Sequence, residues 1–246
     1  MPSSAPIETA MVLAAGLGKR MKPLTDTMPK PMVPLAGKPL IGHTMDRLVD
    51  AGIKKAVVNL HYMGEQIKDY LSDETRLEIV YSEEPEILET GGGVANAMTE
   101  LGTSPFYCAN ADAFWLNGFE DALGRLAERW NDDEMDGLLM LHSTVDGFGY
   151  TGVGDFMAEA DGKLCRRPDC EVVPWLFTGV QILHPRLFDG APEGAFSLNV
   201  LYDKAMEAER LFGIVHDGEW FHIGTPDGLA VAEAFLDDPY PGSKKR

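Results

Sequence analysis

The sequence predicts an α/β protein in which helices flank a mostly parallel sheet. Three observations support this class. Short apolar segments alternate with segments of helical period, glycine and other turn residues separate them, and 246 residues with 45% apolar side chains suffice for a large core. Strands separated by helices imply right-handed βαβ units. Because no internal repeat or low-complexity linker divides the chain, we expect one domain over residues 1–246.

The expected elements follow the period of the apolar residues. An apolar run over Thr9–Ala15 suits a strand buried on both faces, and Gly16 ends it. Leu40–Ala51 has one apolar face at helical spacing, and Gly52 ends it. The same alternation continues with strands at Lys55–Leu60, Leu77–Tyr81, Pro105–Asn110 and Gly137–His142 and helices at Gly64–Leu71, Gly93–Leu101 and Phe119–Trp130.

The alternation changes after residue 149. Tyr150–Glu159 and Lys163–Arg166 are expected to form an antiparallel hairpin around Asp161-Gly162, as an insertion or subdomain. The α/β pattern then returns with strands at Phe177–Leu183 and Leu211–Val215 and helices at Leu198–Glu209 and Pro226–Leu236. Ligands of open α/β sheets bind beyond the carboxyl ends of the strands, so we expect a site among the turns that start at Gly16, Tyr81, Asn110 and His142.

The composition excludes several classes of function. With 21 basic and 39 acidic residues the net charge is −18, which disfavours nucleic acid and anionic membranes as partners. The chain has no apolar run of about 18 residues, and its first ten residues lack the features of a signal peptide, so we expect a cytoplasmic protein. Cys108, Cys165 and Cys170 are too few for a disulfide framework, and we expect them to be reduced and structural.

One segment departs from the acidic composition, and we call residues 16–38 the basic loop. Gly16 and Gly18 allow backbone N–H groups to approach an anion, and four prolines stiffen the loop. It is not a dinucleotide fingerprint, which would need glycine at Met21, and the chain has no P-loop motif. Its charged residues are Lys19, Arg20, Lys22, Lys30 and Lys38 against the single acid Asp26.

The stretch Leu13–Pro31 reads L-A-A-G-x-G-x-R-M-x-P-L-T-x-x-x-P-K-P, which resembles the signature of the sugar-1-phosphate nucleotidyltransferases. The resemblance implies a Rossmann-like fold, with a nucleotide-binding half in residues 9–142 and a small antiparallel sugar-binding lobe with closing α/β elements in residues 143–236. It extends along nearly the whole chain, through Leu88–Gly93, Asn110–Asp112, Phe177–Gly179 and Trp220–Gly224.

The chain is similar in particular to the family members that use UTP and N-acetylmuramate 1-phosphate in bacterial cell-wall recycling. This similarity rests on the short length, the L-E-T-G-G-G run that ends at Gly93, and the stretch around His184 and Pro185. Mannose-1-phosphate guanylyltransferases of the same fold are the close alternative. The sequence does not decide the base, the sugar or the oligomeric state.

The resemblance also implies roles for individual residues. Arg20 would hold the departing phosphates of a nucleoside triphosphate, Lys30 would neutralise charge on the α-phosphate, and Asp112 would bind Mg²⁺. His222 stands where the family usually has a second metal-binding aspartate; imidazole suits Mn²⁺ or Co²⁺ better than Mg²⁺, so its role as a ligand is left open. The expected nucleotide-binding residues are Ala14, Ala15, Gly16, Gly18, Glu89, Gly91 and Gly92, and those for the sugar phosphate are Gly154, Asp155 and Arg167.

Two other classes of protein compete with this interpretation. A nucleotide-sugar binding protein without turnover is suggested by His222 in place of an acid. A Rossmann oxidoreductase is disfavoured, because the third glycine is missing and the second strand ends with Asn59-Leu60 rather than with an acidic residue. Asn59 and His61 lie where that strand ends and are expected to border the site, His61 as a structural residue.

Overall fold

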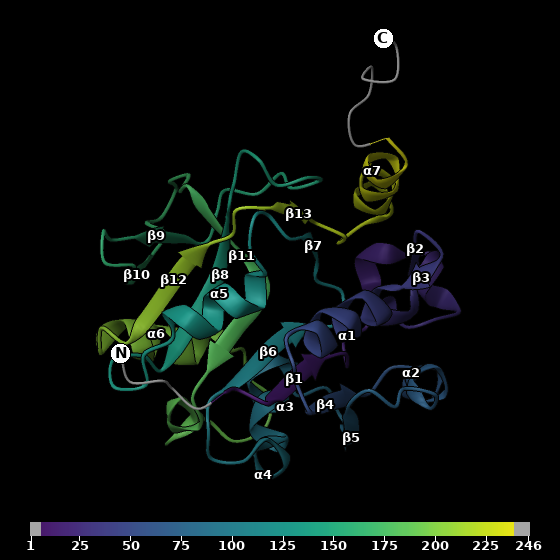
Figure 1. The fold of residues 1–246 in the computed structure, drawn as a ribbon, viewed down its shortest axis with the longest axis horizontal. Helices are drawn as coiled ribbons and strands as arrows, with labels where there is room; N and C mark the ends of the chain where they lie inside the picture. The colour runs from purple at the N-terminus through teal and green to yellow at the C-terminus, as the bar shows by residue number, and fades with distance from the viewer. Residues whose placement is uncertain (1–5, 239–246) are drawn as a thin grey trace.

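The computed structural model describes residues 6–238, and a nine-stranded mixed sheet forms their centre (Figure 1). The half of the sheet that comes from the first 110 residues is parallel, as predicted: β1 (Thr9–Leu13) lies between β6 (Phe106–Asn110) and β4 (Lys55–Leu60), and β5 (Glu78–Glu83) follows at the edge. The carboxyl ends of these four strands therefore meet at one edge of the sheet. The predicted fold class is confirmed.

The other half of the sheet is built around a long strand, β11 (Trp175–Leu183), which runs antiparallel to β6 and to β8 (Gly137–Ser143). β12 (Leu211–Val215) extends the sheet parallel to β8. The antiparallel direction of β11 was not predicted, because a strand buried on both faces is apolar whichever way it runs. A break in register between Phe177 and Gln181 bends β11 where it passes the end of β6.

Helices cover both faces of the sheet, and residues of β1 alternate between them. Ala10 and Val12 pack in the same apolar cluster as α1 (Leu40–Asp50), α2 (Gly64–Leu71) and α5 (Ala122–Arg129), whereas Met11 packs in the cluster on the opposite face. That second cluster contains α3 (Glu89–Asn96), α4 (Met98–Leu101) and α6 (Asn199–Glu207). In Figure 1, α1 and α5 lie on the viewer's side of the sheet.

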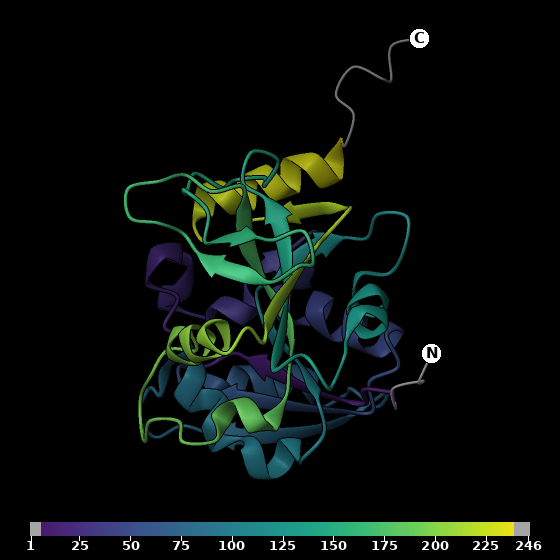
Figure 2. The same ribbon diagram turned by 90° about the vertical axis from the view of Figure 1, so that its left-hand side faces the viewer.

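The predicted hairpin after residue 149 is present and shorter than expected. β9 (Phe156–Ala158) pairs antiparallel with β10 (Leu164–Arg166), and Phe156 joins it to the main sheet opposite Trp175. Figure 2 shows this hairpin and α7 (Pro226–Asp237) at one end of the molecule, with α3 and α4 at the other. A second, two-stranded sheet of β7 (Phe114–Leu116) and β13 (Glu219–Phe221) was missed, because strands of three residues are too short to show a period.

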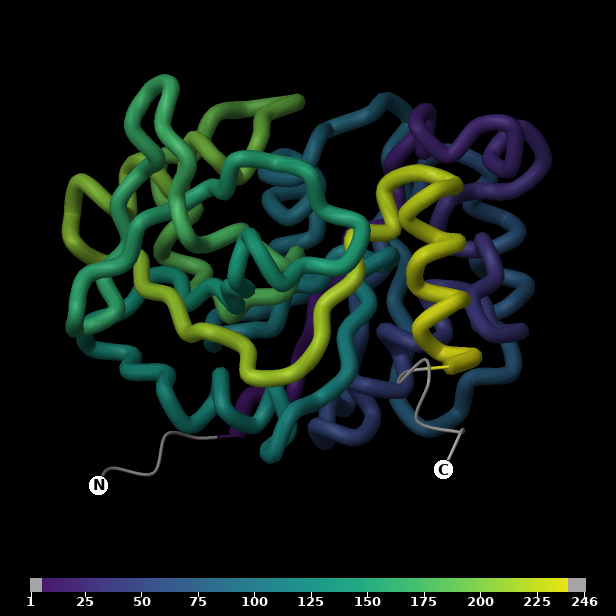
Figure 3. Tube along the Cα trace, turned by 90° about the horizontal axis from the view of Figure 1, so that it is seen from above, coloured from purple at the N-terminus to yellow at the C-terminus, as the bar shows by residue number. Residues whose placement is uncertain are grey.

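The basic loop contains three 3₁₀ turns, at Lys19–Met21, Leu24–Asp26 and Lys30–Met32, followed by the small hairpin β2 (Pro34–Leu35) and β3 (Lys38–Pro39). Helix α7 lies over this loop (Figure 3). Leu229 and Ala232 of α7 share an apolar cluster with Met21 and Val33 of the loop. The loop is therefore held against a helix from the far end of the chain, which agrees with the predicted stiffness.

Two predicted helix boundaries were wrong. The helix expected from Phe119 begins at Ala122, because the side chain of Asp121 accepts a hydrogen bond from the Gly124 amide (2.7 Å) and caps it, while Phe119 is fully exposed. The helix expected over Gly93–Leu101 begins four residues earlier, at Glu89, so that it contains the three glycines, and it divides into α3 and α4 after Asn96.

The cysteines and the helix lengths bear on two further expectations. Cys108, Cys165 and Cys170 are all free, but only Cys108 is buried, so the expectation of structural cysteines was wrong for the two exposed ones. Among residues 6–238, no helix has both the length and the apolar composition that a membrane span requires.

Candidate active site

Two cavities open at the sheet edge where β1, β4, β5 and β6 end, and they share a wall. We call the one of about 360 Å³ the first-loop cavity and the one of about 280 Å³ the lobe cavity. The first-loop cavity is lined by Leu13, Ala15, Gly16, Arg20, Asn59, Glu84, Ile87, Glu89, Thr90, Asn110 and Asp112. The lobe cavity is lined by Arg20, Lys30, Asn110, Asp112, Ala113, Tyr150, Asp155, Phe177, Thr178, Gly179, Trp220, Phe221, His222, Ile223 and Gly224.

The shared wall consists of Arg20, Asn110 and Asp112. Lys30 is ion-paired with the carboxylate of Asp112, and its side chain is 16% exposed. Asp112 closely follows β6, and Lys30 opens a 3₁₀ turn between two prolines, so both charges sit on rigid backbone. We call this group of four residues the junction. The structure thus brings together three of the residues predicted from the sequence, Arg20, Lys30 and Asp112.

The start of the basic loop is fixed by Gly18. Its φ of +60° is left-handed, and a Cβ at this position would lie 2.9 Å from Cγ2 of Thr25. The hydroxyl of Thr25, a buried residue, donates to the carbonyl of Gly18 (2.9 Å). Gly18 also lines a recess of about 200 Å³ beside Lys19, Arg20, Lys30 and Gly224, which opens next to the junction.

The far wall of the first-loop cavity is a buried hydrogen-bond network. Oδ1 of Asn59 accepts from the amide of Ala14 (2.7 Å), and Nδ2 of Asn59 donates to Oε1 of Glu84 (2.6 Å). The sequence predicted that the backbone of Ala14 and Ala15 would contact a base. The amide of Ala14 is already used by Asn59, and Ala14 is not among the lining residues, whereas Ala15 and Gly16 are.

The glycine run lies against the segment before α6 and is not part of the cavity lining. Gly91 and Gly92 donate their amides to the carbonyl of Phe196 (2.8 and 3.1 Å), and a Cβ on Gly91 would lie 2.4 Å from the Phe196 ring. Gly91 and Gly92 are not among the residues that line the cavity, so their position does not support the prediction that a base lies on them. They give room for the segment before α6, while Glu89 and Thr90, at the start of α3, line the cavity instead.

Of the predicted sugar-side residues, Asp155 lines the lobe cavity, and its Oδ2 accepts from the Phe177 amide (2.8 Å). Gly154 is buried behind it with φ +82°, where a Cβ would lie 2.4 Å from the carbonyl of Val173. Arg167 is not among the lining residues. Its Nη1 donates to the carbonyls of Pro168 and Glu171, within its own loop (3.2 and 3.0 Å).

His222 lies in the lobe cavity close to the junction. Burial, together with the positive charges of Lys30 and Arg20, lowers the pKa of His222 below that of a free histidine, although Asp112 opposes this shift. Its imidazole is therefore neutral at pH 7. Gly224 makes room for the ring, because a Cβ there would lie 2.4 Å from Nε2 of His222.

The donor atoms at the junction suit a divalent cation that is bound mainly by its substrate. Mg²⁺ in nucleotide enzymes is typically held by one or two carboxylates, phosphate oxygens and water. Asp112 offers one carboxylate, shared with Lys30, and His222 offers a neutral imidazole. Among residues 6–238, no group of three or more His, Cys, Asp and Glu side chains is placed to hold a metal ion.

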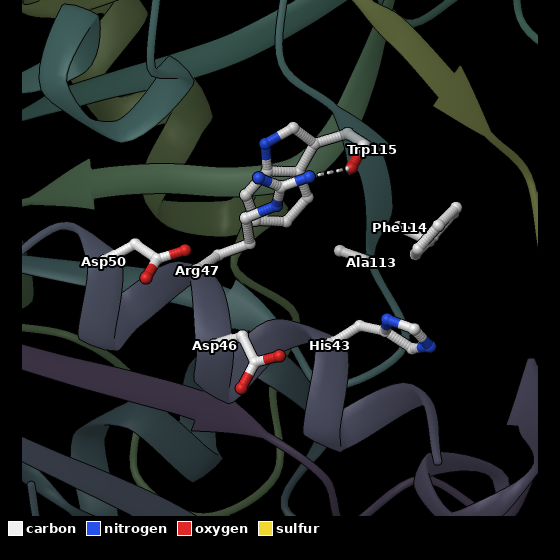
Figure 4. Close-up of a pocket in the computed structure, with 7 residues that line it drawn as sticks. All are labelled: His43, Asp46, Arg47, Asp50, Ala113, Phe114 and Trp115. Carbon is white, nitrogen blue, oxygen red and sulfur yellow. Dashed lines mark hydrogen bonds between the residues drawn. The ribbon is translucent and has the colours of Figure 1, made fainter. Parts of the chain in front are cut away.

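Another recess, of about 250 Å³, lies between α1 and β7 (Figure 4). Arg47 stacks on Trp115 at 5.7 Å and donates to its carbonyl (3.0 Å), and Asp46 pairs with Lys38 and Arg76. Asp46 and Arg47 thus already have partners within the protein. The contacts of Arg47 with Trp115 hold α1 against β7, and none of the four junction residues lines this recess.

Several cavity residues were missed by the sequence interpretation. Glu84 stands directly after a strand end, which is a usable signal in a parallel sheet, and Asn110 was expected only as the start of a turn at the site. Tyr150 and Trp220 had no such signal. Trp220 reaches the cavity through β13, where its Nε1 donates to the carbonyl of Thr178 (3.0 Å), and Gly179 with φ +87° makes room for Asn110.

Comparison with known proteins identifies the class to which this fold and junction belong. A family model described as nucleotidyl transferase matches residues 9–238, and the chain belongs to this family. The family predicted from the motifs is therefore confirmed, and with it the enzyme class.

The relatives narrow the comparison. The chain is 40% identical over 239 residues to N-acetylmuramate alpha-1-phosphate uridylyltransferase of Caulobacter vibrioides, covering 95% of this chain and 98% of the relative. The enzyme of the same name from Neisseria meningitidis is 38% identical, covering 92% and 96%. Mannose-1-phosphate guanylyltransferase 1 of Arabidopsis thaliana is 30% identical, and the alignment covers 93% of this chain and 64% of that relative.

Solved structures agree on the fold. A UDP-glucose pyrophosphorylase in complex with UDP-glucose superposes with a TM-score of 0.78 over 94% of this chain and 99% of the other. The sequence identity is 17%, so this likeness concerns the fold alone.

Proposed function

We propose that this chain transfers a uridylyl group from UTP to N-acetylmuramate 1-phosphate, giving UDP-N-acetylmuramate and pyrophosphate in cell-wall recycling. The observation that carries the proposal is the junction, where two cavities meet at Arg20, Asn110 and Asp112. A transfer between two bound substrates needs such a meeting point. The identities of 40% and 38% to uridylyltransferases over nearly their whole length support the choice of substrates.

In this proposal UTP occupies the first-loop cavity and the sugar phosphate occupies the lobe cavity. The lining residues support this division, since those of the first-loop cavity all lie between Leu13 and Asp112, while the lobe cavity adds residues between Tyr150 and Gly224. The nucleotide-binding half in residues 9–142 and the sugar-binding lobe in residues 143–236 remain part of the proposal.

The reaction brings two polyanions together, and positive charge is what the protein must supply. An oxygen of the sugar phosphate attacks the α-phosphorus of UTP, a new P–O bond forms, and the bond from the α-phosphorus to the bridging oxygen of the β-phosphate breaks. Pyrophosphate leaves with that electron pair. No base is needed, because the attacking oxygen is already ionised.

Arg20 and Lys30 are the residues to which we assign this charge. Arg20 belongs to both cavities and can hold the departing phosphates, and Lys30 can reach the α-phosphate from its place beside Asp112. Neither side chain has to be brought into position during the reaction, because the apolar cluster with α7 already holds the basic loop in place. Preorganised charge of this kind lowers the barrier without a cost of reorganisation.

For the metal, we propose Mg²⁺ held by Asp112 together with phosphate oxygens and water. When bound, the ion would offset negative charge on the phosphates. His222 lies beside this position with a neutral ring, and Mn²⁺ or Co²⁺ would accept its nitrogen more readily than Mg²⁺ would.

The proposal is tested by a matrix assay. UTP, GTP, dTTP and CTP are crossed with N-acetylmuramate 1-phosphate, mannose 1-phosphate and other sugar 1-phosphates, and pyrophosphate is measured. We expect the largest kcat/KM with UTP and N-acetylmuramate 1-phosphate. A preference for GTP and mannose 1-phosphate would establish the guanylyltransferase alternative, and tight UTP binding without any pyrophosphate would establish a binding protein.

The location of the protein and its other partners follow from its substrates and its charge. An enzyme that consumes a nucleoside triphosphate needs a supply of it, and we propose the cytoplasm as its location. The net charge of −18 argues against nucleic acid and anionic membrane as partners.

A further inference from the structure

Asn59 and Glu84 form a buried pair that the transfer chemistry does not use. Asn59 is 2% exposed and Glu84 is 3% exposed, and both side chains line the first-loop cavity. A carboxylate at such burial is costly unless its oxygens accept hydrogen bonds. Oε1 of Glu84 accepts from Nδ2 of Asn59 (2.6 Å), and Oε2 accepts from the amide of Leu88 (3.2 Å).

The two hydrogen bonds of the Asn59 side chain fix the orientation of its carboxamide group. Its Oδ1 accepts from the amide of Ala14 (2.7 Å), so its Nδ2 must face Glu84. One side chain at the end of β4 thereby ties the first residue after β1 to the residue after β5. An aspartate at residue 59 could accept from Ala14 but could not donate to Glu84.

The space around the pair is closed by α3. A Cβ on Gly93 would lie 2.7 Å from both Nδ2 of Asn59 and Oε1 of Glu84. The third glycine of the run therefore lets helix α3 pack directly against the pair. With the helix on one side and Ala14 on the other, the carboxylate has one fixed position in the cavity wall.

We propose that Asn59 is a positioning residue for nucleotide binding, which holds the loop after β1 and the Glu84 carboxylate in the geometry that the nucleotide requires. The inference rests on the proposed function, because it takes the first-loop cavity as the nucleotide site. Asn59 acts through Glu84 and through Ala14, whose neighbours Ala15 and Gly16 face the cavity. Loss of the pairing therefore weakens nucleotide affinity more than it slows the transfer.

A donor and acceptor exchange tests the proposal. In Asn59→Asp two carboxylates face each other. In Glu84→Gln the side chain has one acceptor oxygen for the two donors, Nδ2 of Asn59 and the amide of Leu88, so one of these donors faces the new NH₂ group. The double variant restores every pair: the carboxylate introduced at position 59 accepts from Ala14 and from the side-chain amide introduced at position 84, and the side-chain carbonyl at position 84 accepts from Leu88. The double exchange also keeps the net charge of the pair at the wild-type value, so only the placement of donors and acceptors changes.

Dissociation constants for UTP and GTP are measured by calorimetry at 25 °C on the whole protein, after circular dichroism and thermal melting show which variants are folded. We expect each single variant to bind about 10- to 100-fold more weakly, the scale of a mispaired buried charged hydrogen bond. The double variant should return to within about threefold of wild type. In turnover assays KM for the nucleotide should rise, while kcat should stay within about threefold.

The matched control is Asn96→Ala, which removes a hydrogen bond to Ser82 (2.9 Å) between the same α3 and β5 outside the cavity. It should leave the dissociation constant unchanged.

Single variants that melt at a lower temperature yet bind like wild type would overturn the proposal. A folded double variant that binds as weakly as the weaker of the two single variants would also overturn it. If Asn59→Asp does not fold, Glu84→Gln and the double variant decide. Wild-type binding without turnover would refute the proposed function alone, and wild-type protein that binds neither nucleotide would refute both.

Discussion

The ammonium group of Lys30 is ion-paired with the carboxylate of Asp112, and the pair joins the basic loop to the carboxyl end of β6. The side chains are 16% and 25% exposed, so the pair is partly shielded from solvent. It fixes a cation and a potential metal ligand side by side before any substrate is bound. Three predictions concern this junction.

Replacing Arg20 or Lys30 by Ala should lower kcat by about two to three orders of magnitude, because each removes one preorganised charge from the place where phosphate charge develops. Circular dichroism and the melting temperature should change little. The matched control is Lys22→Ala, in the same loop, whose side chain is 61% exposed and pairs with Asp26. Wild-type turnover in Lys30→Ala, or an equal loss of turnover in the control, would contradict a catalytic role for the charges of the basic loop.

Asp112→Asn should weaken nucleotide binding in the presence of Mg²⁺ more than in its absence. The substitution keeps the shape of the side chain and removes the negative charge that would hold the cation. Calorimetric titration with UTP, with and without Mg²⁺, measures the two effects separately. Equal losses under both conditions would assign Asp112 to holding Lys30 and not to binding metal.

His222→Asp should leave activity intact or raise it at low Mg²⁺ concentration, since it adds a carboxylate beside Asp112. We expect Asp112 to be the only protein ligand of Mg²⁺ in the wild type. The measurement is turnover against Mg²⁺, Mn²⁺ and Co²⁺ concentration for both proteins. A wild type that works only with Mn²⁺ or Co²⁺, together with an inactive variant, would make His222 a ligand and contradict this expectation.

The stability of the protein should fall as the pH drops below about 6.5, and His216 should contribute to this loss. His216 is 4% exposed, and its Nε2 is bonded to the Leu116 carbonyl (3.0 Å). Burial lowers the pKa of His216, and His142 and Arg125 lower this pKa further. The hydrogen bond to Leu116 and the charge of Asp217 act in the opposite direction. The folded protein therefore binds fewer protons than the unfolded chain between the lowered pKa and about 6.5.

Within that window stability rises with pH, and above it the contribution of His216 is constant. One such group changes the unfolding free energy by at most about 1.4 kcal/mol per pH unit. His216→Gln can still donate to Leu116 and cannot become charged, so its denaturant-measured stability should depend less steeply on pH between about 5 and 7. An unchanged slope would show that other groups, such as His184 and His222 with their lowered pKa values, carry the whole effect.

The strand ends were the part of the fold that the sequence predicted best. A buried strand is a continuous apolar run, and Gly16 or Asn110 marks where it stops, so the edge that carries Asp112 could be placed without a structure. The direction of β11 and the pairing of β7 with β13 could not, since they depend on contacts between residues about 70 to 100 positions apart that leave no local pattern.

The same distinction explains the site. Arg20, Lys30 and Asp112 lie within or beside a motif, whereas Glu84 is one acidic residue among many in an acidic chain. Its role depends on burial and on Asn59, which only the fold reveals. For Arg167 the resemblance implied a phosphate contact, whereas in the structure its guanidinium bonds to its own loop and it lines neither cavity of the junction.

The measurement that tests the central claim most directly is the formation of product by purified protein given UTP, N-acetylmuramate 1-phosphate and Mg²⁺. UDP-N-acetylmuramate is quantified by mass spectrometry and pyrophosphate by a coupled assay, with Lys30→Ala in parallel. Transfer at the junction predicts equimolar UDP-N-acetylmuramate and pyrophosphate from the wild type, and about 100-fold or more slower formation of both by the variant. No UDP-sugar from the wild type, or equal rates from the two proteins, would contradict it.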